Sequence, residues 1–258
     1  MTSDTTQTEL ASAVTEPVID SATEDLRERI ARARVVLWDF DGPICRLFAG
    51  HSAEQVAIEL VVWLERQGLH GLLTVAERES PDPHVVLRAV NLRHPGSDLV
   101  EELEERLTQE ELRAVPRAMP TAYADVLIQT WQAVGARLAI TTNNSARTVR
   151  SYLQERKVTR CFSPHIYGRT QNLHLLKPDP YCLNLALERM GAAPSTALMI
   201  GDSPADYRAA CRAGVPFLGY ARNERKEKEL RAVGAQTIVD SFEPVLGVVR
   251  GLSGTGQA

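Results

Sequence analysis

An apolar run at residues 35–38 ends abruptly in Asp39-Phe40-Asp41-Gly42. The run has the composition of a buried strand, yet burying two nearby carboxylates without partners is costly. The end of a strand that opens into a loop is where α/β enzymes hold their chemistry. Side chains two residues apart share one side of an extended chain, and Gly42 permits a sharp turn. The pattern therefore indicates a nucleophile and an acid/base group beside a metal ion.

Strand and helix patterns alternate on both sides of a central segment. After a helix at 24–32 and the first strand, strands are predicted at 137–141, 166–168, 197–200, 215–219 and 237–239, and helices at 122–134, 146–156, 181–190, 206–213 and 226–233. Such alternation is typical of a parallel sheet covered by helices on both faces. The predicted fold class is therefore α/β.

The central segment, residues 46–119, shows helical spacing and no strand pattern. Ser52 is a plausible N-cap for a helix with Val56, Leu60 and Leu64 on one face, and Thr108 is interpreted as the start of another helix. The acidic run 101–105 is typical of a solvated helix face. We predict an all-helical domain inserted into a core made of residues 23–45 and 120–250.

Composition limits the remaining possibilities. The chain of 258 residues has a formal net charge of −4, which gives no electrostatic case for binding nucleic acid. Four scattered cysteines form no CxxC pair and suit reduced thiols, and no apolar run approaches the ~20 residues that span a bilayer. We expect a cytoplasmic protein without a membrane partner, a disordered extension at 1–22 and a flexible tail at 251–258.

Three further signals follow predicted strands. Thr141-Thr142-Asn143 offers hydroxyls and an amide, Lys177 lies before a proline, and Asp202 and Asp206 follow Gly201. In a parallel sheet these strand ends converge on one edge. Carboxylates, a lysine and hydroxyl or amide donors are what phosphoryl transfer needs: a nucleophile, ligands for Mg²⁺ and groups that stabilise the spreading negative charge.

In this order the four signals resemble the haloacid dehalogenase-like superfamily, the phosphatase branch that includes phosphoglycolate phosphatases and β-phosphoglucomutases. The resemblance implies a Rossmann-like core and identifies the helical insertion as that family's cap. It implies that Asp39 is the nucleophile, that Asp41 is the general acid/base, and that Lys177 stabilises charge and binds phosphate. Phosphate would also be bound by Thr142, which directly precedes an asparagine as in the family, and by Asn143. Mg²⁺ would be held by Asp39, Asp41 and Asp202, with Asp206 orienting the lysine or a metal-bound water.

One departure is Pro43, where the family usually has Thr or Val; proline would stiffen the loop after the nucleophile.

The identity of the reaction is narrowed by two features. Asp41 supplies a proton that a halide would not need, which favours a phosphate ester over a haloacid. The insertion contains no lysine, which argues against an imine with a phosphonate substrate. We expect a phosphatase acting on a small-molecule phosphate ester, as a monomer or homodimer. A phosphosugar mutase and a binding or regulatory protein with residual activity remain open alternatives.

Overall fold

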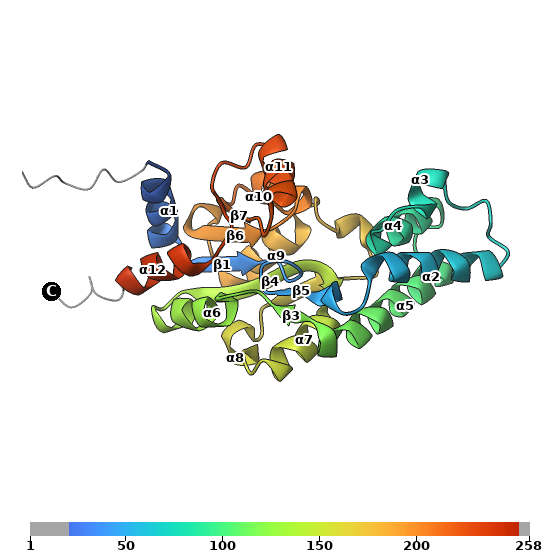
Figure 1. Ribbon diagram of the computed structural model, residues 1–258, viewed down its shortest axis with the longest axis horizontal. Helices are drawn as coiled ribbons and strands as arrows, with labels where there is room; N and C mark the ends of the chain where they lie inside the picture. The colour runs from blue at the N-terminus through green and yellow to red at the C-terminus, as the bar shows by residue number, and fades with distance from the viewer. Residues whose placement is uncertain (1–20, 253–258) are drawn as a thin grey trace, which may run out of the picture.

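The computed structural model describes residues 21–252 of the chain and has a parallel sheet at its centre (Figure 1). Six strands are ordered β5-β4-β1-β6-β7-β8, and every neighbouring pair is parallel. Their bounds are β1 Val35–Trp38, β4 Arg137–Ser145, β5 Ile166–Arg169, β6 Ala197–Gly201, β7 Phe217–Tyr220 and β8 Ile238–Val239. The predicted α/β class is confirmed.

Alternating side chains of β1 separate the core into two layers. Val36 and Trp38 belong to a cluster packed under five helices: α1 (Ser21–Arg32), α6 (Ala124–Ala133), α7 (Ala146–Glu155), α8 (Thr159–Phe162) and α12 (Glu243–Leu252). Val35 and Leu37 belong to the opposite cluster, under α9 (Tyr181–Met190), α10 (Pro204–Ala213) and α11 (Glu224–Ala232). A strand that is apolar on both sides is thus explained by a sheet covered on both faces.

The central segment forms a helical cap, which we define as α2 (Ala53–Arg66), α3 (Val75–Arg78), α4 (Pro83–Arg93) and α5 (Asp98–Ala114). The cap has its own apolar cluster and extends away from the sheet (Figure 1). Ser52 caps α2 as predicted, because its side chain accepts a hydrogen bond from the Gln55 amide. The predicted helix start at Thr108 is wrong: Thr108 lies inside α5, with its side chain bonded to Glu104 and Arg169.

A short antiparallel ribbon joins the cap to the sheet. β2 (Cys45–Arg46) enters the cap and pairs with β3 (Met119–Pro120), which leaves it. The sequence predicted no strand here, because two residues are too few to show an alternating pattern. The ribbon holds the two ends of the insertion together beside β1. Thr121 strengthens this joint, since its hydroxyl donates to the Gly42 carbonyl at 2.6 Å.

Element ends differ from the predictions by a few residues. α12 was not predicted; it reaches residue 252, beyond the proposed core limit at 250, and α1 begins at residue 21. The proposed disordered extension and flexible tail otherwise lie outside the described residues. The four cysteines are free thiols, as expected. Among the described helices, none combines the length and apolar character that crossing a membrane requires.

Candidate active site

Asp39 lies directly beyond β1, where strand pairing still fixes its backbone. The register pairs Trp38 with Ile140 on one side and Ile200 on the other, and the Asp39 amide donates to the Ile200 carbonyl at 2.8 Å. Trp38 itself is fully buried, as a strand residue facing the core should be. The Asp39 carboxylate therefore leaves the sheet at its carboxyl edge, between the ends of β4 and β6. It is only 10% exposed.

Lys177 is buried among oxygen atoms from three elements. Its ammonium group contacts Asp39 Oδ1 at 2.8 Å and Asp206 Oδ1 at 2.5 Å, and it donates to the Thr141 carbonyl at 2.8 Å. Three partners match the three N–H donors of an ammonium group. Burial by itself lowers the pKa of Lys177, but the charges of Asp206 and Asp39 outweigh it and raise the pKa above the ordinary value. Lys177 is thus a cation that lies against the Asp39 carboxylate.

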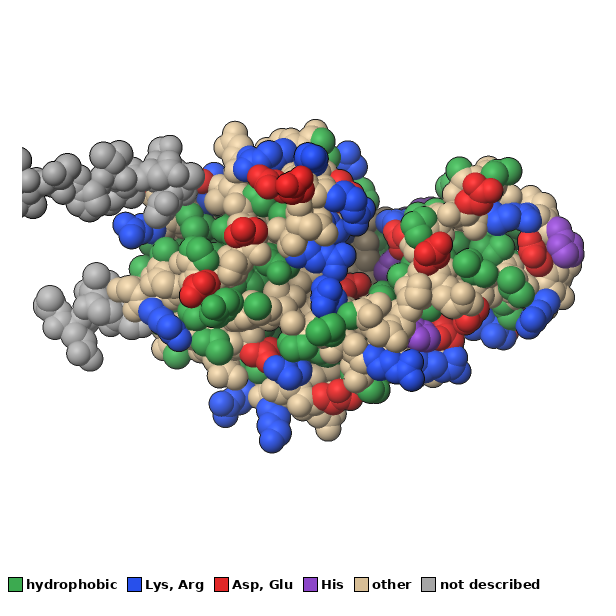
Figure 2. Space-filling view, in the orientation of Figure 1, with side chains coloured by type: hydrophobic (Ala, Val, Ile, Leu, Met, Phe, Trp, Pro, Cys, Tyr) green, Lys and Arg blue, Asp and Glu red, His purple; other side chains and the backbone are tan. Residues whose placement is uncertain are grey.

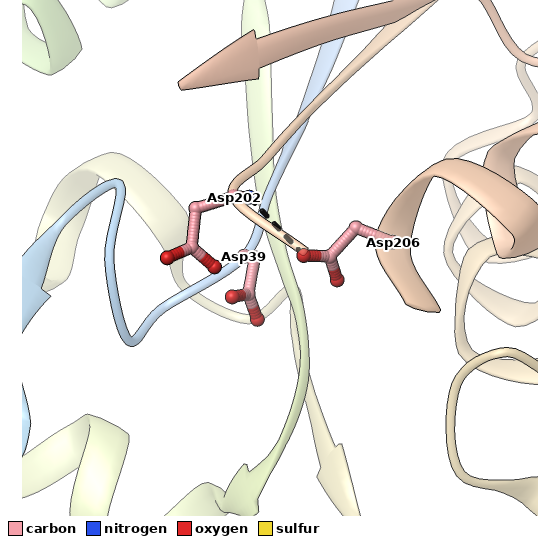
Figure 3. A group of neighbouring side chains, drawn as sticks. All are labelled: Asp39, Asp202 and Asp206. Carbon is pink, nitrogen blue, oxygen red and sulfur yellow. Dashed lines mark hydrogen bonds between the residues drawn. The ribbon is translucent and has the colours of Figure 1, made fainter. Parts of the chain in front are cut away.

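Asp202 and Asp206 approach Asp39 from the end of β6 and the first turn of α10 (Figure 3). One oxygen atom from each of the three carboxylates lies within 4.8 Å of the others. Asp206 Oδ2 accepts hydrogen bonds from the Asp202 amide at 3.2 Å and from the Ser203 amide and hydroxyl at 3.0 and 2.7 Å. These bonds fix the turn that presents Asp202. We call Asp39, Asp202, Asp206 and Lys177 the catalytic cluster, after the role that we propose for them below.

Two glycines permit this close packing of carboxylates. A Cβ atom on Gly42 would lie 2.4 Å from Asp202 Cγ, and one on Gly201 would lie 2.4 Å from Asp206 Cβ. Gly42 also has a φ of +125°, which side-chain-bearing residues rarely adopt. Pro43 follows it as a buried turn residue between β1 and β2. Both glycines of the sequence motifs are therefore explained by contact with the carboxylates themselves.

Asp41 lies outside the group of three convergent carboxylates and contacts the segment that enters the cap. Its Oδ1 accepts a hydrogen bond from the Leu47 amide at 2.8 Å, in the segment that enters the cap. The group of three convergent carboxylates contains Asp206 in the place that the sequence analysis gave to Asp41. Binding of a metal by the Asp41 carboxylate stays a prediction. Its position ties the candidate general acid to the start of the cap.

Thr142 and Asn143 follow on β4, on the other side of Asp39 in the sheet order. The Thr142 hydroxyl donates to Asn144 Oδ1 at 3.1 Å and accepts from the Asn144 amide at 3.2 Å. The neighbouring Thr141 hydroxyl instead lies against Met199 in the core. Asn143 holds the backbone of Lys177 at both ends: its Oδ1 accepts from the Lys177 amide at 2.8 Å and its Nδ2 donates to the Lys177 carbonyl at 3.1 Å. In this structure the Asn143 side chain therefore positions the lysine.

Burial and mutual repulsion raise the pKa values of the site carboxylates. For Asp39, desolvation and the charges of Asp206 and Asp202 outweigh Lys177 and raise the pKa to about 7. Burial is also the main cause that raises the pKa of Asp41 to about 6 and that of Asp202 to about 6. The cluster contains more negative charge than its own cation compensates. Three convergent carboxylate oxygens with such an excess are a donor set that suits Mg²⁺.

The sequence analysis missed a second lysine at the site. Lys226, in the first turn of α11, places its Nζ 3.0 Å from Asp202 Oδ2, with 17% of its side chain exposed. The chain has only four lysines, and two of them contact site carboxylates. That scarcity was the one signal in the sequence that could have drawn attention to Lys226.

A second buried charge group lies where the cap meets the sheet. Arg169, at the end of β5, donates to Glu111 Oε1 at 2.7 Å, to Glu104 Oε1 at 2.9 Å and to the Asn143 carbonyl at 3.0 Å. Glu111, on α5, also accepts from the Ser145 amide at 2.9 Å. The Arg169 and Glu111 side chains are both 0% exposed. We call Arg169 and Glu111 the anchor pair, because they fix α5 to the turn after β4.

His84 of α4 completes this contact from the cap. Its Nε2 lies 3.1 Å from the Asn143 carbonyl and 3.8 Å from Glu111 Oε1. One turn along α4, Arg88 donates to the Lys177 carbonyl at 3.2 Å. The cap thus rests on the backbone of Lys177 and on that of Asn143, the residue whose side chain positions the lysine. Figure 2 shows the molecule hollowed by a notch between the cap and the core, with Lys and Arg side chains on the core side.

Comparisons with known proteins agree with this geometry. A family model described as haloacid dehalogenase-like hydrolase matches residues 33–214. A phosphoglycolate phosphatase of Pseudomonas syringae pv. tomato is 31% identical over 222 residues, covering 83% of this chain and 78% of its own. A phosphoglycolate phosphatase of Pseudomonas savastanoi pv. phaseolicola is 28% identical over the same shares.

Solved structures show the same fold at lower sequence identity. CbbY from Rhodobacter sphaeroides in complex with phosphate gives a TM-score of 0.58 at 21% identity, covering 81% of this chain and 95% of that one. A HAD-superfamily hydrolase of subfamily IA from Geobacter sulfurreducens gives 0.54 at 20% identity, covering 84% and 97%. These matches extend over the core and the cap together.

Proposed function

The chain belongs to the haloacid dehalogenase-like hydrolase family, and from this premise we propose that it is a Mg²⁺-dependent phosphatase. It would hydrolyse a small-molecule phosphate monoester through an aspartyl-phosphate intermediate. The observation that carries the proposal is the catalytic cluster, in which Asp39 contacts Lys177 and lies within 4.8 Å of carboxylate oxygens from Asp202, just beyond β6, and Asp206, in the first turn of α10. The division into a core and a cap inserted at residues 46–119 is part of the proposal.

The residues can be assigned to the two halves of a hydrolysis. In the first, an Asp39 oxygen attacks phosphorus, the bond to the ester oxygen breaks, and Asp41 gives its proton to the leaving alkoxide. In the second, Asp41 takes a proton from water, whose oxygen attacks phosphorus and releases Asp39 and phosphate. The pKa of about 6 suits Asp41 to this exchange, because burial lets it hold and release a proton near neutral pH.

The remaining residues handle the charge of the phosphoryl group. Lys177 holds one oxygen of Asp39 and leaves the other to react, and with Thr142 it stabilises the negative charge on the transferred group. Asp39 and Asp202 would hold Mg²⁺, with Asp206 beside them. The ion supplies the positive charge that lets an anionic nucleophile approach an anionic substrate.

The experiment is a phosphate-release assay on purified protein, with Mg²⁺ or with EDTA, over a panel of small esters. Phosphoglycolate should be tested first, because relatives of 28–31% identity are named phosphoglycolate phosphatases. Sugar phosphates, nucleoside monophosphates and phosphoserine follow. The proposal expects release that requires Mg²⁺ and is lost in Asp39→Asn. Isomerisation of a sugar phosphate without release would instead identify a mutase, and binding without turnover a regulatory protein.

A further inference from the structure

Lys226 is a cation of the site that the proposed mechanism leaves without a role. It is held at its backbone by the Asn223 side chain, which caps α11 and accepts from the Lys226 amide at 3.0 Å. Its ammonium group lies 3.0 Å from Asp202 Oδ2. A lysine fixed at both ends in this way is built into the site, whereas Lys228, two residues further on, is 80% exposed and pairs only loosely with Glu224 at 3.8 Å.

The two site lysines contact different carboxylates. Lys177 binds Asp39 and Asp206, while Lys226 binds Asp202, which has no other cation among the ion pairs of residues 21–252. The Asp202 carboxylate also packs on Gly42, because a Cβ atom there would lie 2.5 Å from Oδ2, the oxygen that Lys226 contacts. Gly42 and Lys226 therefore both lie against this carboxylate, and Mg²⁺ would have to share it with Lys226.

Charge balance shows what this second cation changes. With Asp41 protonated, as the first half of the proposed hydrolysis requires, the carboxylates of Asp39, Asp202 and Asp206 carry three negative charges when ionised, and the two lysines carry two positive charges. A bound Mg²⁺ would bring the sum to +1, so that a phosphate dianion would meet a positive site. Without Lys226 the loaded site would be neutral and would lose this attraction.

We propose that Lys226 is a positioning residue that weakens Mg²⁺ binding at Asp202 and, in exchange, strengthens the binding of the phosphate group. Both effects follow from one fixed positive charge, which repels the metal ion and attracts the anion. The inference rests on the magnesium site of the proposed function. It assigns Lys226 a part in selecting the dianionic phosphoryl group, and it explains why Asp202, the proposed metal ligand just beyond β6, is paired with a lysine of α11.

The test is a pair of calorimetric titrations on the full-length protein: Mg²⁺ into metal-free protein, then orthophosphate into Mg²⁺-saturated protein. In Lys226→Met we expect the Kd for Mg²⁺ to fall roughly tenfold and the Kd for orthophosphate to rise roughly tenfold, the size of a unit-charge effect at short range in a water-like dielectric. Lys226→Arg keeps the charge and should leave both constants near the wild-type values. Lys228→Met removes the same charge from an exposed position of the same helix and should change neither constant.

Shifts of opposite sign separate a charge effect from damage to the site. A misplaced Asp202 would weaken both ligands, and that result in Lys226→Met would overturn the inference, as would no shift in either constant or equal shifts in Lys228→Met. Circular dichroism and thermal melting of each variant show that it is folded, and Lys226→Gln repeats the test if the methionine variant is not. Phosphate release by the wild type is measured in parallel. Release without the opposite shifts refutes the role of Lys226 alone, whereas the opposite shifts without release refute the phosphatase alone.

Discussion

Two groups of buried charges lie at neighbouring strand ends, and they are built differently. In the anchor pair, burial raises the pKa of Glu111, but the charges of Arg169 and His84 and hydrogen bonds from Arg169 and the Ser145 amide outweigh it, so that the pKa lies below its ordinary value. In the catalytic cluster, the pKa of Asp39 is raised to about 7, because burial and two further carboxylates outweigh Lys177. The negative charge of Glu111 is therefore compensated by its neighbours, whereas the negative charge of the catalytic cluster is not.

The difference separates a structural role from a chemical one. A compensated ion pair fixes geometry: the anchor pair holds α5 against the turn after β4 and gives Asn143 a defined position. An uncompensated set of carboxylates costs folding free energy and is justified by what it binds or does. Replacing a member should therefore have opposite effects on stability in the two groups.

The largest expected effect is on turnover in Asp39→Asn. The amide keeps the shape of the side chain but cannot act as the nucleophile, and phosphate release should fall at least about a hundredfold. The same change removes one of the uncompensated negative charges of the catalytic cluster, so the melting temperature of the metal-free protein should rise. Calorimetric melting in EDTA and a phosphate-release assay measure the two effects. Release near the wild-type rate would show that the nucleophile is another residue.

Breaking the anchor pair should instead lower the stability of the protein. Arg169→Met leaves Glu111 buried and unpaired, and we expect a loss of about 3–5 kcal/mol in the free energy of unfolding measured in urea. Arg147→Met is the matched control on α7: it breaks an exposed pair with Glu105 on the same helix α5, and should cost at most about 1 kcal/mol. Equal losses in the two variants would remove the distinction between buried anchor and surface pair.

Asp41→Asn tests the proposed general acid, which is not itself a member of the catalytic cluster. An alkyl phosphate needs a proton on its leaving oxygen, so its hydrolysis should slow by about a hundredfold or more. Nitrophenyl phosphate releases a stable anion and should lose much less. Steady-state kcat/KM for the two esters gives the comparison. Equal losses on both would contradict the general-acid role of Asp41.

The smallest effect is a difference in pH dependence. Asp202 has a pKa raised to about 6, mainly by burial, so the folded protein binds this proton more tightly than the unfolded chain does. Ionisation of the buried Asp202 carboxyl should therefore reduce the stability of the folded protein as the pH rises from about 4 to about 7, and Asp202→Asn should remove that loss. In EDTA the stability advantage of the variant should therefore grow across this range by at least about 1.4 kcal/mol, the equivalent of one pKa unit.

Glu111 supplies the contrast in sign. Its pKa is lowered, so the stability that it contributes is present above the ordinary pKa of a glutamate and is lost as the pH falls through the folded value. Urea unfolding of Glu111→Gln and of the wild type, at a series of pH values, should show the deficit of the variant shrinking in acid. A deficit that grew in acid would show that the sign is wrong.

The positions of Asp39, Lys177 and Asp202 could be read from the sequence because each has a local signature. Asp39 and Asp202 end apolar runs, and parallel strands bring such ends to one edge whatever the loops between them do. The same local reasoning placed Trp38 in the core and Ser52 at the start of α2. These predictions depend only on neighbours in the chain.

What the sequence could not show are contacts between distant segments. Helical periodicity indicated helices in the central segment, but it could not reveal that α5 continues through Thr108, because a polar residue breaks the pattern unless its partner is known. That partner, Arg169, lies 61 residues away. Likewise, no spacing rule connects Lys226 with Asp202, or gives Asp206 rather than Asp41 a place among the convergent carboxylates.

The sequence by itself therefore determined the α/β sheet and the carboxylates that end two of its strands, since these follow from apolar runs and local turns, whereas the catalytic roles of those residues rest on the resemblance to the family. Only the tertiary structure decided how the charges are shared: which carboxylates meet, which cations compensate them, and where the cap rests. The physical reason is that a buried charge is governed by everything within a few ångströms of it, and those neighbours come from several elements at once.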